Sequence, residues 1–474
     1  MDKDLPFLEP EIFWAGESGD GKTISEFPII YYTMGNIWSV TGRQFWMYRL
    51  LDFFIFFLGL WYLRKICIAF LGAGFWSNVI PLFFFTSGLL AFYSNNFLMN
   101  VNAMSLALVG SFHFVKFYQD KERKRLWFAA GIFTFAALLK VTSLLLFFGA
   151  GAILLFEILR TKSLINRWKD LLPLALLFVP VIAWHAYVHH YNSQHTAMVF
   201  LQGILPIWEL NDFDIGNNWE LLTTTLLPTY FNRWVLVFLL LSFPVLMLVR
   251  KKKEPVLVAM SALVILGTTA YILLFYQVFN HHDYYLINLL PLVALLCLSF
   301  IYFTKENFAK IYYHWATKTI ALVGVCLMCW STATNNVMKF DVGSDFVKNS
   351  PFIEEEDLKL WQWFHWDYER GLKHLENIDP YLDSLGIERN EKVFSSPDAS
   401  INISLYLLNR PGYSEYGFAE YQNEDKVEYL ISKGVRYMII NKPETRDQEY
   451  LKPYMEDSIG ARGNTVIYRL SSKR

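Results

Sequence analysis

The sequence predicts a polytopic α-helical membrane protein with a small C-terminal α/β domain. Of its 474 residues, 54% are hydrophobic and 18% are aromatic, and the mean hydropathy is +0.27. The apolar residues fall in runs of about 20, the length that a helix needs to cross a hydrocarbon core about 30 Å thick. From residue 335 onward these runs stop, and short strand-like and helix-like segments alternate.

Residues 1–44 are predicted to form an external loop followed by a helix at the membrane surface. The first 21 residues are polar and acidic, without the basic and apolar regions of a signal peptide. The chain turns at Glu26-Phe27-Pro28, and the aromatic segment Ile29–Val40 follows. A carboxylate and a proline ahead of an aromatic amphipathic segment favour an interfacial helix, which would hold Glu26 at the boundary between water and lipid.

Residues 45–334 are predicted to form a transmembrane domain of about ten helices. Basic residues of short loops collect on the cytoplasmic side, and clusters such as Lys121–Arg125 and Arg250–Lys253 alternate with loops poor in positive charge. This pattern places the N-terminus, the turn at Asn280–Asp283 and everything after Thr334 outside. The predicted spans are residues 45–63, 75–93, 100–118, 126–140, 141–159, 171–188, 234–249, 255–276, 284–303 and 316–333.

One apolar run, Leu126–Leu159, is too long for a single span. As one helix its 34 residues would reach about 50 Å and would put one of its flanking basic clusters on the wrong side. We therefore expect a hairpin with Lys140 at or near its outer turn. A lysine in an apolar segment costs about 2.5–3.5 kcal/mol unless it has a partner or water. Lys140 either snorkels to the interface or meets an anionic lipid head group.

A second outer turn carries His281, His282, Asp283 and Tyr284 ahead of a helix that contains a proline. Two histidines and an aspartate could bind a metal ion, although adjacent positions rarely converge on one ion. A hydrogen-bonding patch for phosphate or sugar is the favoured interpretation. The remaining alternative is a polar loop with an aromatic belt.

Two arginines lie near the outer surface at the start of the first span. Arg43 and Arg49 have the planar geometry that suits phosphate recognition. Arg49 is also three residues from Asp52 on a predicted helix, so the two charges could simply neutralise one another.

The C-terminal residues 335–474 are predicted to form an extracytoplasmic α/β domain with a mainly parallel sheet. The domain shows no glycine-rich phosphate loop and no nucleophile elbow, so we expect an accessory role, such as capping the outer face or selecting the acceptor. The expected strands are 391–397, 435–441 and 465–470, and the expected helices are 400–409, 425–433 and 448–455.

Charge and cysteine content exclude several classes of function. The net charge of −1 and the lack of a basic outer patch predict no nucleic-acid partner. The four cysteines lie in or beside apolar runs, so neither a disulfide framework nor a zinc site is expected, and Cys326 and Cys329 are interpreted as helix-packing residues. No cofactor is predicted, and a divalent metal ion stays open.

The order of motifs around Glu26 resembles one protein family. Glu-Phe-Pro, two tyrosines, an aromatic stretch, a glycine and then Tyr48-Arg49-Leu50-Leu51 are similar to the segment after the first external loop of bacterial polytopic glycosyltransferases. These belong to the GT-C class, which is dolichyl-phosphate-mannose-protein mannosyltransferase-like (glycosyltransferase family 39-like). The likeness covers most of the chain and implies a GT-C-like fold in a bacterial inner membrane.

The resemblance also implies a reaction: transfer of a sugar from a polyprenyl-phosphate donor to a glycan, lipid or protein acceptor at the outer membrane surface. A lysine in a stretch similar to that around Lys140 would contact the carrier phosphate. A His-x-Tyr-Tyr stretch like that of residues 282–285 would lie where the lipid-linked sugar binds. Lys140 and the arginines would stabilise the departing phosphate.

The catalytic base of the family is not found at its usual place in this sequence. In the family it is usually an aspartate upstream of Glu-Phe-Pro, behind an N-terminal helix, and neither has a counterpart here. We therefore expect that Met1 is not the native start, or that Glu26 or another N-terminal carboxylate serves as the base. The alternative functions are a transporter or flippase of lipid-linked sugars and a truncated, non-catalytic homologue.

Overall fold

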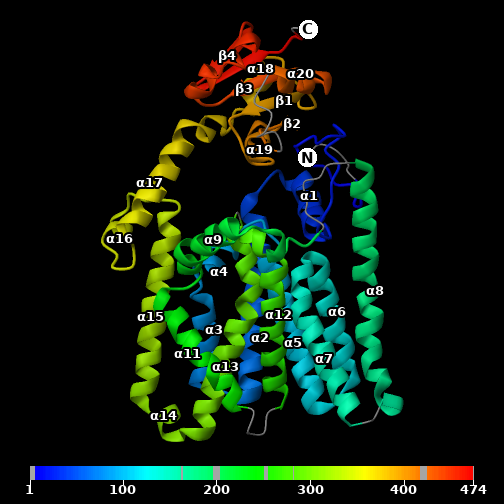
Figure 1. The fold of residues 1–474 in the computed structure, drawn as a ribbon, viewed down its shortest axis with the longest axis vertical. Helices are drawn as coiled ribbons and strands as arrows, with labels where there is room; N and C mark the ends of the chain where they lie inside the picture. The colour runs from blue at the N-terminus through cyan, green and yellow to red at the C-terminus, as the bar shows by residue number, and fades with distance from the viewer. Residues whose placement is uncertain are drawn as a thin grey trace. The chain divides into compact units, whose positions relative to one another are not determined.

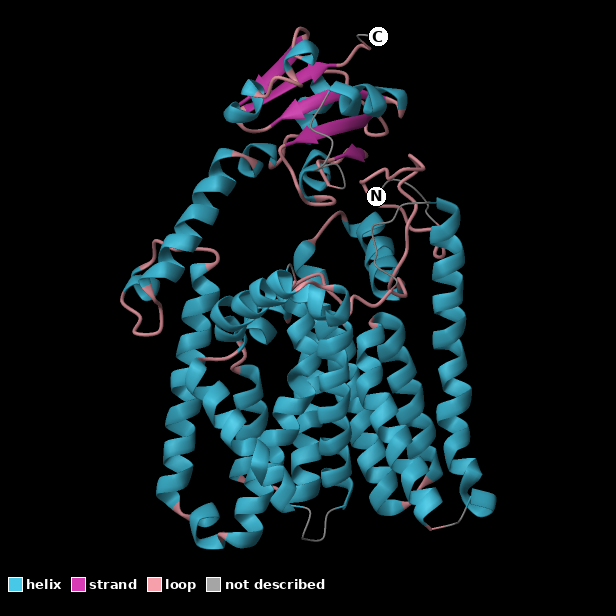
Figure 2. Cartoon of the chain, viewed as in Figure 1, coloured by secondary structure: helices cyan, strands magenta, loops and turns pink. Residues whose placement is uncertain are grey.

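The computed structural model describes residues 6–161, 164–195, 203–249, 255–280, 282–416 and 424–472 (Figure 1). It divides into two compact units. One is a helical unit of residues 26–185 and 203–353, and the other is an α/β unit of residues 1–25, 186–202 and 354–474. Figure 2 shows that the strands are confined to the C-terminal part of the chain.

The helical unit is built from long apolar helices joined by short turns. Between them lie the short 3₁₀ helices η1 (Val141–Ser143), η2 (Ile207–Glu209), η4 (Tyr276–Asn280) and η5 (Asp283–Leu289), and the π-helix η3 (Leu222–Leu226). Its helices are α1 (Ile29–Thr41), α2 (Phe45–Leu71), α3 (Phe75–Phe85), α4 (Gly88–Tyr93), α5 (Asn100–Asp120), α6 (Arg123–Leu139), α7 (Leu144–Arg160), the first part of α8 (Leu164–His195), α9 (Asp212–Leu221), α10 (Leu227–Tyr230), α11 (Arg233–Val249), α12 (Pro255–Leu274), α13 (Leu290–Asn307), α14 (Ala309–Tyr313), α15 (Trp315–Met338) and α16 (Asp345–Lys348).

Six of the described helices are long and apolar enough to cross a membrane. A seventh span arises if the bent pair Asp212–Tyr230 and Arg233–Ser242, which meet at 96°, counts as one. Each of the ten predicted runs contains helix, but some of these helices are short or broken. The run 75–93 breaks into α3 and α4 because Ser87 caps a new helix by accepting a hydrogen bond from the Leu90 backbone N–H. The chain is thus a multi-pass membrane protein.

The hairpin predicted for residues 126–159 is confirmed. Helix α6 ends at Leu139, Lys140 is extended at φ −154° and ψ 115°, and α7 begins after the turn η1. The break therefore falls at Lys140 itself. Among the described residues of this hairpin, the basic side chains other than Lys140 are at the opposite ends of the two helices, at Arg123–Arg125 and Arg160.

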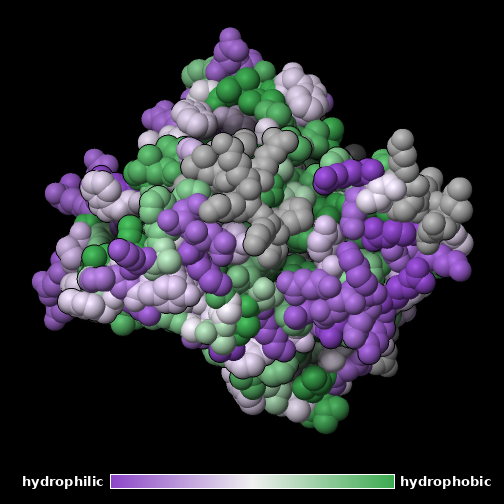
Figure 3. All heavy atoms as spheres, turned by 90° about the horizontal axis from the view of Figure 1, so that it is seen from below, coloured by the Kyte–Doolittle hydropathy of each residue, from purple (hydrophilic) through white to green (hydrophobic). Residues whose placement is uncertain are grey.

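That basic end is polar and solvent-facing. Lys121 pairs with Glu157 at 3.6 Å, and Arg123 pairs with Asp170 at 3.0 Å, which ties the α5–α6 and α7–α8 connections together. Figure 3 looks at this end and shows hydrophilic side chains gathered in several groups among hydrophobic ones. Basic side chains of the α5–α6 connection thus lie at this end of the helical unit, as the loop pattern predicts.

Helix α1 confirms the predicted aromatic segment as a helix. Its buried residues Ile30, Met34 and Trp38 repeat every four positions and face the core, while Tyr32 and Val40 are exposed. Gly42, with φ at +75°, then lets the chain turn into α2. A helix with one buried and one exposed apolar face suits the interfacial position that the sequence predicts.

The α/β unit contains a mixed sheet with the strand order β2-β1-β3-β5-β4. Strand β1 pairs in parallel with β2 and β3, whereas β5 pairs antiparallel with β3 and β4. Its strands are β1 (Lys392–Ser396), β2 (Gly412–Tyr413), β3 (Val435–Ile440), β4 (Ser458–Arg462) and β5 (Thr465–Arg469). The other elements are α17 (Glu355–Arg370), η6 (Leu372–Leu375), α18 (Asp379–Ser384), α19 (Ile403–Leu408), α20 (Glu424–Ser432), η7 (Pro443–Asp447) and η8 (Lys452–Tyr454).

Three expectations were wrong, two in this unit and one on α15 of the helical unit. The sheet is not mainly parallel, because two of its four strand pairs are antiparallel. Residues 448–455 do not form a helix: Pro453 lies in the short turn η8, and a proline blocks the continuation of a helix from the preceding residues. Cys326 and Cys329 are exposed on α15, so they do not pack inside the protein.

The N-terminal segment joins the edge of this sheet. The backbone of Ala15 donates to the Gly412 carbonyl at 2.7 Å, and the Gly412 backbone N–H donates to the Phe13 carbonyl at 2.8 Å. The Trp14 backbone N–H also donates to Asn402 at 2.8 Å. Residues 13–15 therefore cover the edge that β2 would otherwise expose.

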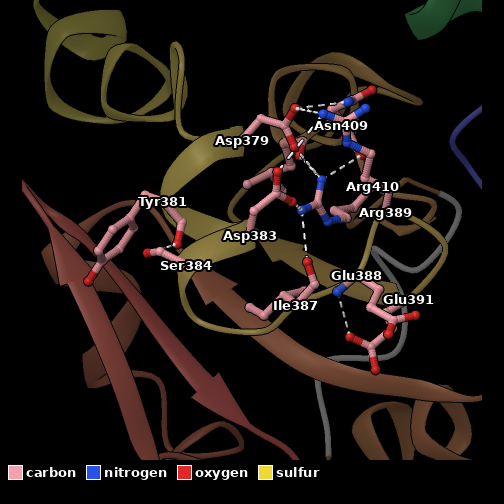
Figure 4. Close-up of polar contacts among 11 residues, drawn as sticks. Asp379, Tyr381, Asp383, Ser384, Ile387, Glu388, Arg389, Glu391, Asn409 and Arg410 are labelled. Atoms are coloured by element: carbon pink, nitrogen blue, oxygen red, sulfur yellow. Dashed lines mark hydrogen bonds and ion pairs between the residues drawn. The ribbon is translucent and has the colours of Figure 1, made fainter. Parts of the chain in front are cut away.

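A buried arginine organises the region beside the sheet. The Arg410 side chain is fully buried and donates to Asp379 and Asp383, each at 2.5 Å, and to the Ile387 carbonyl at 2.8 Å (Figure 4). Burial alone would raise the pKa of Asp379, but hydrogen bonds from Arg410 and Asn409 outweigh it and hold this pKa below its ordinary value. The cluster joins α18 to the end of α19.

Candidate functional site

The structure brings Glu26 and Lys140 together, although they are 114 residues apart in the sequence. The Lys140 ammonium donates to a Glu26 carboxylate oxygen at 2.7 Å, and the two side chains are 17% and 22% exposed. The backbone fixes this approach, because the Phe27 N–H donates to the Leu138 carbonyl at 2.9 Å at the last turn of α6. Both residues lie outside helices, at one end of the helical unit.

An aromatic surface adjoins this ion pair. The Lys140 ammonium lies 6.0 Å from the centre of the Tyr285 ring, and Tyr284 stacks on Tyr285 with ring centres 4.9 Å apart. His282 is exposed, and its ring is 5.1 Å from that of Tyr284. The Lys140 ammonium and these three rings therefore lie next to one another.

Asn288 fixes the turn that carries these rings. It accepts a hydrogen bond from Thr142, two residues after Lys140, at 2.8 Å, and donates to the Tyr271 hydroxyl of α12 at 2.9 Å. The turn η5 is therefore held to both the α6–α7 hairpin and α12. The relative positions of Lys140 and the tyrosines depend on this connection.

Asp283 lies on the other side of the tyrosine pair. Its carboxylate accepts a hydrogen bond from the Tyr93 hydroxyl at 2.6 Å, and the Tyr93 ring packs edge-on against Tyr284 at 6.1 Å. Lys339, just after α15, places its ammonium 4.0 Å from the Phe92 ring centre. Burial lowers the pKa of Lys339, and the negative charge of Asp283 partly opposes that change.

The two predicted arginines, Arg43 and Arg49, lie at the junction of α1 and α2. Arg43 is exposed between α1 and α2, and Arg49 is exposed on α2 with its guanidinium 5.9 Å from the Phe97 ring. Phe97 accepts hydrogen bonds from Tyr31 and Tyr48 through its backbone carbonyl at 3.0 and 3.2 Å. Arg49 is thus linked through Phe97 to Tyr31 at the start of α1.

Asp52 does not neutralise Arg49 in the way the sequence suggested as an alternative. It is 2% exposed and accepts a hydrogen bond from Asn102 of α5 at 2.6 Å. Its second oxygen has no hydrogen-bond partner among the described residues. The Arg49 guanidinium lies instead over the ring of Phe97.

The predicted outer turn is described only in part. His281 lies outside the described residues, while His282, Asp283 and Tyr284 are placed as given above. Within the described parts of the chain, no group of three His, Cys, Asp or Glu side chains is arranged to hold a metal ion.

Some site residues had no clear signal in the sequence. Lys339 follows an apolar run and looks like an ordinary flanking cation. The closeness of Glu26 and Lys140 also has no local signal, because it depends on how the segment before α1 attaches to the end of α6. Only the charge cost of Lys140 in an apolar run indicated a partner.

Comparisons with known proteins place this geometry in a known fold. No protein-family model and no curated protein matches the chain. Among solved structures, ArnT from Cupriavidus metallidurans in the apo state matches at a TM-score of 0.57 and 12% identity, covering 94% of this chain and 88% of that chain. ArnT from the same organism bound to undecaprenyl phosphate matches at 0.53 and 11% identity, covering 95% and 89%. These matches confirm the GT-C class fold, so the chain is a membrane protein with an ArnT-like GT-C fold.

Proposed function

We propose that this protein transfers a sugar from a polyprenyl-phosphate donor to an acceptor hydroxyl. The observation that carries the proposal is the Glu26–Lys140 pair, which lies beside the stacked Tyr284 and Tyr285 at one end of the membrane helices. The ArnT-like fold adds support, because one of the similar ArnT structures is bound to undecaprenyl phosphate.

The proposed roles follow from the charges at the site. The bond between the anomeric carbon and the phosphate oxygen breaks while the acceptor oxygen attacks that carbon, with inversion as the family resemblance implies. The phosphate keeps the bonding electrons, and Lys140 stabilises its charge. Arg43 and Arg49 attract the anionic donor to this end. The acceptor proton passes to a carboxylate, for which Glu26 is the proposed base.

The aromatic turn would hold the sugar. Tyr284 and Tyr285 offer ring faces, while Asp283 and His282 offer hydrogen-bonding groups at their edge. Lys339 adds a cation near Asp283 on the far side of the rings. Together these groups suit a hydroxylated ring bound between Lys140 and Asp283.

We further propose that this end faces the outside of a bacterial inner membrane. The support is the charge difference between the two ends, because the clusters around Arg123 and Lys305 lie at the opposite end of the helices. Everything after the last span, including the α/β domain, would then be extracytoplasmic. The acceptor would be a glycan, lipid or protein on that side.

The test supplies purified full-length protein with a radiolabelled polyprenyl-phosphate hexose and a membrane lipid and glycan extract. We expect release of free polyprenyl phosphate together with a labelled product, and we expect Lys140→Ala to reduce the rate at least 100-fold. Lys124→Ala is the matched control, because Lys124 is 82% exposed at the opposite end. Transport of the intact donor across sealed vesicles without release would contradict the proposal and favour a flippase.

A further inference from the structure

The Lys140 ammonium already has a partner in this structure. It donates to Glu26 at 2.7 Å, a charge-assisted hydrogen bond of ordinary strong length. A donor phosphate that is to bind Lys140 directly must compete with that carboxylate. The Glu26 carboxylate therefore occupies the position on Lys140 that the donor phosphate would take.

The surroundings allow this exchange without loss of the fold. The two side chains are 17% and 22% exposed, so a phosphate can reach them from solvent. Lys140 is an extended residue between α6 and η1, and Glu26 precedes α1, so a rotation of either side chain breaks no helical hydrogen bond. The hydrogen bond from Phe27 to Leu138 still holds the two backbones together, and Glu26 stays near the site after it is released.

We propose that binding of the donor phosphate to Lys140 displaces Glu26, and that the released Glu26 carboxylate becomes the base for the acceptor hydroxyl. This inference rests on the proposed function and deepens it. While Glu26 Oε1 accepts the hydrogen bond from the Lys140 ammonium, that oxygen is not available to an acceptor hydroxyl. Donor binding removes that pairing, so the base is activated only when the donor is in place.

The exchange gives a balanced reaction and an order of binding. The acceptor O–H proton passes to Glu26, and the acceptor oxygen bonds to the anomeric carbon. The leaving phosphate keeps the electrons of the broken C–O bond, and Lys140 stabilises its negative charge. After the products leave, Glu26 returns its proton to water and pairs with Lys140 again. The donor binds before the acceptor, and the unloaded enzyme does not activate hydroxyl groups.

Asp283 provides the internal comparison. Its carboxylate is held by the neutral Tyr93 hydroxyl at 2.6 Å rather than by Lys140. Removal of its charge therefore frees no partner of the phosphate-binding lysine. If tighter phosphate binding came only from the lower negative charge of the site, both Glu26→Gln and Asp283→Asn would show it. If it comes from the release of Lys140, only Glu26→Gln will show it.

The test measures binding of undecaprenyl phosphate to the full-length protein in detergent, together with turnover. Glu26→Gln should bind this probe about five- to tenfold more tightly while turnover falls at least 100-fold; tenfold corresponds to about 1.4 kcal/mol. Glu26→Asp, which keeps the charge, should bind within twofold of the wild type. Asp283→Asn should not bind more tightly.

The outcomes separate this inference from the proposed function. If Glu26→Gln binds the probe as the wild type does, or more weakly, the exchange is wrong even when Lys140→Ala abolishes binding. If Lys140→Ala binds as well as the wild type, the phosphate site itself is misassigned and the proposed function fails. Size-exclusion profiles and the behaviour of Glu26→Asp show whether a variant is folded, so a misfolded Glu26→Gln does not leave the question open.

Discussion

Replacement of Arg410 by methionine should loosen the α/β unit more than any exposed charge change in it. The guanidinium is 0% exposed and donates to Asp379, Asp383 and the Ile387 carbonyl, at 2.5, 2.5 and 2.8 Å. Removal of one partner of a buried ion pair costs about 3–5 kcal/mol. Because Asp379 and Asp383 are 23% and 46% exposed, water can solvate them again, and we expect the lower end, about 3 kcal/mol.

Hydrogen exchange on the full-length protein in nanodiscs measures this loss. Backbone amides of β1 and β3 should exchange about 100-fold faster in Arg410→Met, since each factor of ten is about 1.4 kcal/mol. Arg389→Met is the control, because Arg389 contacts the same Asp379 at 3.4 Å but is 53% exposed and should cost less than about 1 kcal/mol. Equal exchange in the two variants would refute the claim that the buried cluster stabilises this unit.

Three further predictions follow from local geometry. The pKa of Asp379 is lowered in the folded state, so its stabilising effect is complete above its ordinary pKa and is lost as pH falls below about 4. The stability difference between wild type and Arg410→Met, measured by thermal unfolding, should therefore shrink below about pH 4. Gly412→Ala should cost about 1–3 kcal/mol and speed exchange in β2, because φ is +155° and a methyl group would meet the Val393 backbone. Tyr93→Phe should raise KM for the sugar donor about tenfold without changing thermal stability, because Asp283 loses its donor.

The sequence predicts the membrane part well where length and charge act together. The break at Lys140 followed from a run too long for one span with basic residues at both ends, and the structure confirms it at that residue. The aromatic segment at residues 29–40 is a helix, as its amphipathic character behind Glu26 and Pro28 predicted, and its buried residues repeat every four positions. Both signals are local, and both are physically strong.

Non-local pairing explains most of what the sequence did not predict. Strand β4 contains Gly460 and polar residues, so it has no apolar alternation, and only its partner β5 makes it a strand. Arg410 stands between an asparagine and a proline, a context typical of an exposed turn, yet α18 buries it. In the site, the charge of Lys140 in an apolar run predicted that it needs an anionic partner or water. Nothing near it in the sequence identifies Glu26 as that partner.

A cryo-electron microscopy structure of the full-length protein with undecaprenyl phosphate would test the central claim most directly. The account predicts the phosphate within hydrogen-bond distance of the Lys140 ammonium, the Glu26 carboxylate turned away from it, and the carrier beside Tyr285. A phosphate bound at the opposite end, near Arg123, or an unchanged Glu26–Lys140 contact with the lipid bound elsewhere, would contradict it.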